Sequence, residues 1–115
     1  MLSNCVFCKI IKGEIHSNIV EQTKHALAFR DINPQAPTHV LIIPKEHIAS
    51  CRDLNEHNVH YLSEMAFLAQ KVATEDNITE NGYRWIINTG NAGGQTVDHI
   101  HLHLMGGRDM KWPPG

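Results

Sequence analysis

Ten residues near the carboxyl end of the chain, DHIHLHLMGG (98–107), constrain its fold more than any other stretch. Histidines occupy every second position, at His99, His101 and His103, and aliphatic residues fill the positions between them. Residues two apart point to the same face of a β-strand, so this strand would have one histidine face and one aliphatic face. A helix would rotate the same residues by about 200° at each two-residue step and scatter the histidines. We therefore predict a strand over 98–105 with its aliphatic face in the core.

The whole chain predicts one α+β domain over residues 1–115, because this length suffices for one core but not for two. Apolar residues at three- and four-residue steps predict one long helix over 54–76, with Asp53 as its N-cap and Glu56 completing a capping pair. A short N-terminal helix should end at Gly13. This order of elements is typical of an antiparallel sheet with a helix packed on one face. The other strands are expected at 18–22, 26–31, 38–44 and 83–88.

Charge and hydropathy exclude several classes of partner. Ten basic and twelve acidic residues give a net charge of -2, so we expect no nucleic-acid or membrane partner attracted by a general field. The longest aliphatic run, 40–43, is far shorter than the ~20 residues that span a bilayer. Asn4 and Lys9 interrupt the N-terminus before a signal-peptide core could form. These features favour a cytoplasmic location.

Three interpretations of the alternating histidines compete. A solvated polar face is the least favoured, because histidine is uncommon and this spacing is improbable by chance. A metal site is stronger, although three collinear imidazoles cannot all reach one ion about 2.1 Å away without ligands from other segments. In a catalytic row, one histidine attacks while its neighbours fix tautomers and move protons. The stretch alone leaves the metal and catalytic interpretations open.

The preceding connection, NTGNAGGQT (88–96), favours phosphoryl chemistry. It is longer than the two to five residues of an ordinary hairpin loop and contains Gly90, Gly93 and Gly94. Glycines allow main-chain N–H groups to approach an anion such as a phosphate. A flexible hairpin loop remains the alternative for this segment by itself.

Cys5-x-x-Cys8 has the spacing of a metal-binding pair but supplies only two of the four ligands of a closed zinc site. Three cysteines form an odd set, which argues against a disulfide framework. A redox motif would follow a strand in a βαβ unit, and no strand precedes residue 5. Packed thiols without a metal remain the alternative interpretation.

Residues 99–105, HIHLHLM, match the H-x-H-x-H-x-x motif of the histidine triad (HIT) family. The segments CVFCKIIKGEI, AFRDINPQAPTHVLIIPKEHI and NTGNAGGQTVDHIHLHLMGGR and the ending WPPG resemble the Hint branch, the purine nucleoside phosphoramidases, over nearly the whole chain. This resemblance implies a HIT-like antiparallel sheet and a homodimer whose two sheets join into one. It also implies a pocket for an AMP-like purine nucleotide and no catalytic cofactor.

The resemblance assigns roles residue by residue. His101 would be the nucleophile, with His99 and His103 beside it, and His103 would also contact the phosphate. His39 would be a fourth histidine that orients the site. Asp31 would hold the ribose hydroxyls. The remaining expected substrate contacts are Ile32 at the base or ribose, Asn88 and Thr96 at the phosphate or leaving group, Gly94, Gln95 and Val97 in the glycine-rich loop, and Trp112 for specificity.

In relatives that carry the two cysteines, the pair looks like half of a structural zinc site that two histidines complete. This resemblance implies the ligand set Cys5, Cys8, His47 and His99 here. Zinc would tie the N-terminus to the catalytic strand and leave the nucleophile uncoordinated. Asp98 departs from the family pattern, which usually has an aromatic or other bulky residue before the first histidine.

The expected reaction is hydrolysis of the P–N bond of purine nucleoside 5′-phosphoramidates, adenosine 5′-monophosphoramidate in particular, through a nucleotidyl-histidine intermediate. Hydrolysis of dinucleoside polyphosphates is the alternative within the family, and the ending GGRDMKWPPG disfavours it. Two further alternatives are a nucleotide-binding regulatory module with little turnover and a zinc-binding structural protein.

Overall fold

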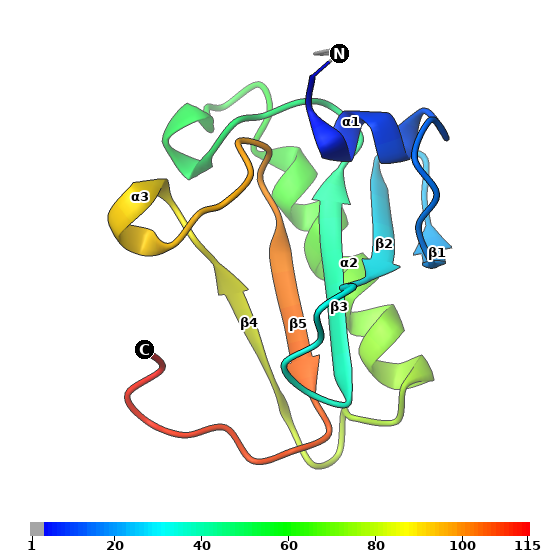
Figure 1. Cartoon of the computed structure of the whole chain (residues 1–115), viewed down its shortest axis with the longest axis vertical. Helices are drawn as coiled ribbons and strands as arrows, with labels where there is room; N and C mark the ends of the chain where they lie inside the picture. Colours follow the sequence, from blue (N-terminus) through cyan, green and yellow to red (C-terminus); the bar gives the residue numbers. More distant parts are fainter. Residues whose placement is uncertain (1–3) are drawn as a thin grey trace.

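A computed structural model describes residues 4–115 as one five-stranded antiparallel sheet with helices packed against it (Figure 1). The strands are β1 (Ile19–Gln22), β2 (Ala26–Arg30), β3 (Thr38–Pro44), β4 (Tyr83–Ile87) and β5 (Leu102–Gly106). The helices are α1 (Val6–Ile11), α2 (His60–Glu75) and the single turn α3 (Gly90–Gly93), with a 3-10 turn η1 at Cys51–Asp53. The order across the sheet is β1-β2-β3-β5-β4. The predicted α+β class is therefore confirmed. None of the helices in the described part of the chain is long and apolar enough to cross a membrane.

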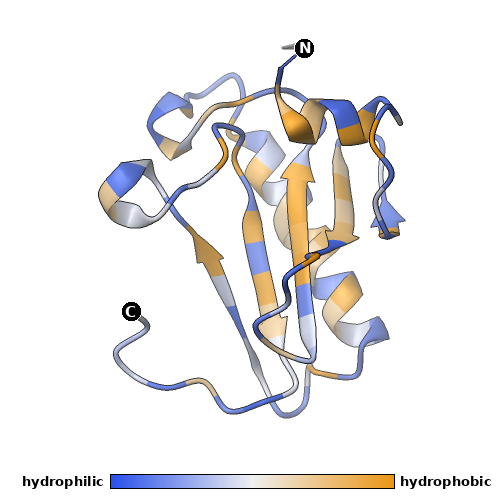
Figure 2. Ribbon diagram, viewed as in Figure 1, coloured by the Kyte–Doolittle hydropathy of each residue, from blue (hydrophilic) through white to orange (hydrophobic). Residues whose placement is uncertain are grey.

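Helices cover both faces of the sheet, which explains the uniformly apolar central strands. All seven residues of β3 are buried, and β2 is buried at four of its five positions. Figure 2 shows β3 as hydrophobic over most of its length, whereas β5 alternates between hydrophobic and hydrophilic segments. The core under α2 includes Val40, Ile42, Met65, Leu68, Val72, Ile100, Leu102 and Leu104. The core under α1 consists of Cys5, Phe7, Cys8, Ile10, Leu27, Phe29, Leu41 and Ile43.

The alternation predicted around the histidines is confirmed, but the strand begins later than predicted. Ile100, Leu102 and Leu104 are each at most 2% exposed and face α2. Regular pairing starts only at Leu102, whereas the prediction placed the strand over 98–105. Ahead of β5 the chain is held by single hydrogen bonds, such as the one from the Ile100 main-chain N–H to the Ile48 carbonyl at 2.7 Å. His99 and His101 therefore lie in an irregular segment that leads into the strand.

The long helix also begins later than predicted. The prediction of a helix over 54–76 is wrong at its start, because α2 begins at His60. Asp53 does not cap α2 and instead completes a capping box with Ser50 around η1. Asn55 accepts hydrogen bonds from the main-chain N–H groups of residues 57 and 58. Asparagine side chains that bond the nearby main chain favour a turn over helix, which explains the delay.

A polar contact ties the end of α2 to the start of β3, next to the predicted site. Arg30 donates two hydrogen bonds to the Asp76 carboxylate, at 2.5 and 2.9 Å, and the Thr38 hydroxyl donates a third at 2.9 Å. The hydrogen bonds from Arg30 hold the pKa of Asp76 below its usual value, against the opposing effect of burial. Thr38 immediately precedes His39 in β3, so this contact holds the backbone directly beside the fourth histidine.

Candidate active site and metal centre

The glycine-rich connection is ordered by the side chain of Gln95. Its Oε1 accepts from the Gly90 main-chain N–H at 3.0 Å, and its Nε2 donates to the carbonyls of Ala49 and Val97 at 2.7 and 3.0 Å. The turn of α3 lies inside the segment that the sequence predicted as a loop. One partly buried amide therefore closes the connection and ties it to the segment before η1.

Of the other predicted substrate residues, Asn88 and Thr96 belong to this connection and Val97 follows it directly. The Asn88 side-chain nitrogen is 3.8 Å from where a Cβ on Gly94 would stand, so these two residues are neighbours. Thr96 and Val97 line a cleft of about 450 Å³ together with Asn4, Cys5 and Val6. These three residues belong to the cysteine segment, residues 4–8, which holds Cys5 and Cys8. Ile32 and Trp112, at 98% and 84% exposed, have side chains in solvent.

His101 is held in one orientation and one tautomer. Its Nδ1 lies 2.8 Å from the carbonyl oxygen of His99, which can only accept, so Nδ1 carries the proton. In the neutral ring, Nε2 then holds the lone pair. All buried side-chain nitrogen and oxygen atoms of residues 4–115 have hydrogen-bond partners, whereas no described residue bonds this Nε2. The Nε2 atom of His101 therefore reaches solvent as a nucleophile requires.

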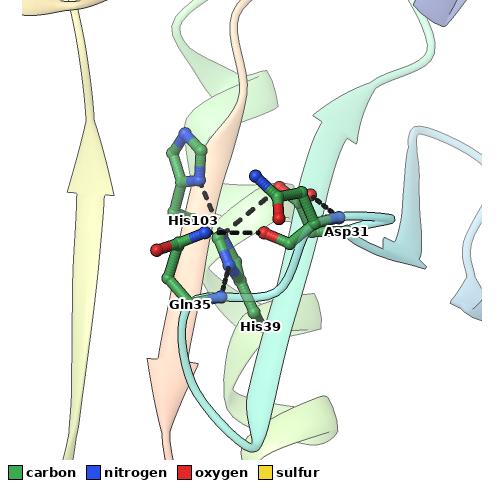
Figure 3. A network of polar contacts seen from close by, with 5 residues as sticks. Asp31, Gln35, His39 and His103 are labelled. Atoms are coloured by element: carbon green, nitrogen blue, oxygen red, sulfur yellow. Dashed lines mark hydrogen bonds and ion pairs between the residues drawn. The ribbon is translucent and has the colours of Figure 1, made fainter.

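A second group of polar side chains, which includes Asp31, His39 and His103, is drawn in Figure 3, and His103 lies next to His101. The ring centroids of His101 and His103 are 5.1 Å apart. The Nδ1 of His103 lies 3.0 Å from the Nε2 of His39, which is 3.4 Å from the Asp31 carboxylate. On its other side, His39 accepts a hydrogen bond at Nδ1 from the Gln35 main-chain N–H at 3.0 Å.

Burial keeps these histidines neutral. It lowers the pKa of His103 to about 4, helped by His101 and His39 and opposed by the Asp31 carboxylate. Burial also lowers the pKa of His39, again against the effect of Asp31. Near neutral pH both rings are therefore uncharged hydrogen-bonding groups rather than acids.

The four predicted zinc ligands converge on one point. One ligand atom from each of Cys5, Cys8, His47 and His99 lies within 4.8 Å of the others. The His99 Nδ1 is 3.4 Å from the Cys5 sulfur and 3.6 Å from the Cys8 sulfur, and the His47 Nδ1 is 3.3 Å from the Cys8 sulfur. A sulfur and a nitrogen bound to one tetrahedral zinc lie about 3.5 Å apart.

The chemistry of His99 also fits a metal. Its Nε2 is 2.9 Å from the Pro44 carbonyl oxygen, so Nε2 carries the proton and the Nδ1 lone pair faces the two sulfurs. Burial lowers the pKa of His99 to about 4, although the Pro44 carbonyl acts in the other direction. The ring is therefore neutral, as a ligand must be.

A second cluster with metal-ligand groups does not fit a metal. The ligand atoms of Asp31, His39 and His103 also lie within 4.8 Å of one another. However, the His39 Nδ1 uses its lone pair to accept from the Gln35 main-chain N–H. A neutral ring then carries its proton on Nε2, the atom that would have to bind the ion. This cluster is a hydrogen-bonded group, and the cysteine cluster remains the candidate metal centre.

Comparisons with known proteins agree with this geometry. A family model described as "Scavenger mRNA decapping enzyme C-term binding" matches residues 4–112. The crystal structure of a HIT family hydrolase from Legionella pneumophila is 54% identical, covers 97% of this chain and 100% of its own, and has a TM-score of 0.95. The chain belongs to the histidine triad (HIT) family. It is an enzyme of that family, a hydrolase.

Curated relatives extend the likeness over almost the full chain. A purine nucleoside phosphoramidase of Escherichia coli strain K12 is 48% identical over 110 residues, which are 96% of this chain and 92% of the relative. A 14 kDa zinc-binding protein of Zea mays is 49% identical over 115 residues, covering 98% of this chain and 89% of the relative. The predicted HIT fold is thus confirmed by proteins that are similar in both sequence and structure.

Two contributors to this HIT site were missed from the sequence. Phe7 packs against the rings of His99 and His101, with centroids 5.8 and 5.2 Å away. Its place between the two cysteines was a signal, but its contact with residues far along the chain needed the fold. Gln35 acts through its main-chain N–H, so its side-chain type gave no signal.

Proposed function

We propose that this HIT hydrolase cleaves the P–N bond of purine nucleoside 5′-phosphoramidates, with adenosine 5′-phosphoramidates as the expected substrates. The observation that carries the proposal is the 2.8 Å hydrogen bond between the His101 Nδ1 and the His99 carbonyl, which leaves the Nε2 lone pair for attack. Similarity to the phosphoramidase of Escherichia coli supports the choice of substrate.

The reaction proceeds in two displacements. First, the His101 Nε2 forms a bond to phosphorus and the P–N bond breaks, and the leaving nitrogen takes a proton from solvent water to depart as an amine. Next, a water oxygen bonds to phosphorus, the P–Nε2 bond breaks, and the proton of that water returns to solvent. One water is consumed, and a nucleoside monophosphate and an amine are formed.

The surrounding residues hold the substrate and stabilise charge on phosphorus. Main-chain N–H groups of the connection around Gly94, with the side chains of Asn88 and Thr96, would donate to the phosphoryl oxygens. His103 would donate as a neutral imidazole, because burial lowers its pKa to about 4. Asp31 would accept from the ribose hydroxyls through its carboxylate, whose Oδ1 is already oriented by the Asn33 main-chain N–H.

The remaining proposed roles concern residues away from the phosphate. Ile32 would cover the base or the ribose and Trp112 would contribute to specificity, because both side chains are exposed and apolar. Gln95 would act by shaping the connection, and Val97 by packing beneath it against the α1 core.

A structural zinc ion is proposed at Cys5, Cys8, His47 and His99. The donor set and the 3.3–3.6 Å separations between sulfur and nitrogen fit tetrahedral zinc. Bound zinc would stabilise the attachment of α1 to the segment before β5. All four ligands come from the protein, so no position is left for substrate, and His101 is not one of them.

A homodimer joined through the sheet is also proposed. β4 is an outer strand of the sheet, so one of its edges has no neighbouring strand among the described residues. Trp85 on this strand is 40% exposed. Light scattering on the purified chain would give the mass of a dimer, and the mass of a single chain at all concentrations would overturn this proposal. The cytoplasmic location stays a prediction.

The test of the enzymatic proposal is hydrolysis of an adenosine 5′-phosphoramidate that carries a fluorescent amine. We expect turnover by the wild-type chain and its loss in His101→Ala, with His57→Ala as the control because His57 is exposed on the surface. Diadenosine polyphosphates form the second substrate class in the assay. Nucleotide binding without hydrolysis of either class would favour the regulatory module, and equal turnover in His101→Ala would exclude His101 as nucleophile.

The covalent step has its own measurement. Acid-quenched mass spectrometry during turnover should find a nucleotidyl group on the peptide that contains His101. A label on any other histidine would reassign the nucleophile while leaving the reaction itself in place.

A further inference from the structure

The loop between β2 and β3 reaches the histidines through its main chain. We propose that the peptide N–H of Gln35, held in place by Arg108, sets the tautomers of His39 and His103 so that His103 presents an Nε2–H group to the phosphoryl oxygens. The inference rests on the proposed function for its catalytic meaning, and it makes Gln35 and Arg108 positioning residues.

The first step is the tautomer of His39. A main-chain N–H can only donate, and that of Gln35 lies 3.0 Å from the His39 Nδ1, so this nitrogen must offer a lone pair. The imidazolium form has no lone pair and the Nδ1–H tautomer has it on the wrong atom. His39 is therefore neutral, with its proton on Nε2.

The second step carries this choice to His103. The Nε2–H of His39 faces the Nδ1 of His103 at 3.0 Å and the Asp31 carboxylate at 3.4 Å. Two N–H groups cannot face each other at 3.0 Å, so the His103 Nδ1 must be the acceptor. The proton of neutral His103 then resides on Nε2.

The third step places that proton in the active site. The rings of His103 and His101 are 5.1 Å apart, and the Nε2 of His103 has no hydrogen-bond partner among residues 4–115. Because buried nitrogens in this part of the chain are all paired, this atom reaches solvent. An N–H at this position stabilises negative charge on a phosphoryl oxygen, whereas the lone pair of the other tautomer would repel it.

The fourth step is the support for the backbone of Gln35. Arg108, in the turn after β5, donates from Nε to the Gln35 carbonyl at 3.0 Å. The Gln35 side chain donates to the Asn33 carbonyl at 3.1 Å, and the Asn33 N–H donates to Asp31 at 2.8 Å. Figure 3 shows Asp31 and Gln35 of this loop beside His39, and Arg108 joins the loop to the turn after β5.

The direct test is the ¹⁵N spectrum of the histidine rings in the wild-type chain near neutral pH, where each tautomer has distinct nitrogen shifts. We expect His39 and His103 as Nε2–H tautomers and His101 as the Nδ1–H tautomer. Finding the proton of His39 or His103 on Nδ1 would overturn the proposal. This readout does not depend on turnover, so the absence of phosphoramidate hydrolysis would reject the proposed function without affecting the tautomer result.

Two pairs of variants test the consequence for catalysis. Gln35→Pro removes the N–H, and its control Gln35→Ala keeps it and removes only the side chain. We expect kcat to fall about 10²–10³-fold in Gln35→Pro, with a smaller change in KM and a mixed tautomer signal for His39. Gln35→Ala should lose much less kcat and keep the His39 tautomer, because it removes only the side-chain hydrogen bond to the Asn33 carbonyl. Equal kcat values with an altered His39 tautomer would overturn the catalytic role.

Arg108→Ala provides a test that does not alter the loop backbone. Arg108→Ala should lower kcat less than Gln35→Pro does, and it should broaden the ¹⁵N signals of the His39 and His103 rings. Lys111→Ala is the matched control, because Lys111 is a nearby exposed cation whose side chain makes no contact with Gln35. If Gln35→Pro fails to fold, the wild-type spectrum and this pair decide the proposal. Unchanged spectra and kcat in Arg108→Ala would remove Arg108 from it.

Discussion

The ring of Phe7 packs edge to face against the ring of His101, with the two centroids 5.2 Å apart. Phe7 is only 6% exposed and lies between Cys5, the N-cap of α1, and Cys8 within that helix. The same ring meets His99, one of the proposed zinc ligands, at 5.8 Å. A single aromatic side chain therefore connects the cysteine segment with the proposed nucleophile.

Replacing Phe7 should affect stability and catalysis together. Phe7→Ala leaves a cavity beside both histidine rings, and we expect the free energy of unfolding to fall by about 3–5 kcal/mol. The loosened His101 should lower kcat as well. Denaturant unfolding and phosphoramidate hydrolysis are the measurements. Phe67→Ala is the control, because Phe67 lies on α2 and is 68% exposed. A folded Phe7→Ala variant with wild-type kcat would mean that the packing does not orient His101.

The proposed zinc site predicts different behaviour for the three cysteines. Elemental analysis should find one zinc per chain in the wild type and in Cys51→Ser, since Cys51 lies outside the cluster. Cys8→Ser should lose the ion because it removes one of four ligands. A chelator should then lower the melting temperature of the wild type and of Cys51→Ser but not that of Cys8→Ser. Equal zinc content in all three proteins would place the metal elsewhere.

The sequence predicted those parts of the fold that depend on local periodicity. Alternation in 98–105 correctly predicted that Ile100 and Leu104 face the core, where they are at most 1% exposed, but it did not predict that His99, at 0% exposed, is equally buried. It did not predict where pairing begins, because this depends on contacts such as that between Ile100 and Ile48, which lie far apart in the chain. The start of α2 was missed for a related reason, since side chains such as Asn55 form a turn in place of helix.

The candidate site divides in the same way. Residue types with distinctive chemistry, such as Cys5, Cys8 and His101, were visible from motif and resemblance. The main-chain N–H of Gln35 was not, because every residue except proline has one and only its position at 3.0 Å from His39 makes it selective. Sequence predicted the candidate reactive groups, and the fold was needed to find the groups that orient them.

The contact of Arg30 with Asp76 predicts a pH-dependent contribution to stability. The pKa of Asp76 is lowered in the folded chain, mainly by hydrogen bonds from Arg30, so the folded state favours the ionised carboxylate. The stabilisation is fully present at pH values above 3.8, the pKa of the Asp76 carboxyl in the unfolded chain. It is lost as the pH falls through the lower pKa that this carboxyl has in the folded chain. Asp76→Asn should therefore cost about 1–3 kcal/mol at neutral pH, and less below pH ~4.

Urea unfolding at several pH values measures this difference. Glu75→Gln is the matched control, because Glu75 is the adjacent exposed carboxylate. It should change stability by less than ~0.5 kcal/mol. A gap between the wild type and Asp76→Asn that stays constant down to pH ~2 would show that the charge of Asp76 does not stabilise the fold.

Two glycines, Gly107 and Gly82, allow the cost of backbone strain to be separated from the cost of a steric clash with the loop between β2 and β3. Gly107 and Gly82 both have positive φ, at +88° and +100°, so alanine at either position costs about 1 kcal/mol in backbone strain. A Cβ on Gly82 would meet nothing within 4 Å, whereas one on Gly107 would stand 2.8 Å from the Pro37 Cβ. Gly107→Ala should therefore be less stable than Gly82→Ala. Because Pro37 lies two residues before His39, Gly107→Ala should also lower kcat, whereas Gly82→Ala should keep the wild-type rate. Equal losses of stability and equal rates in the two variants would mean that the Pro37 loop moves without disturbing the histidines.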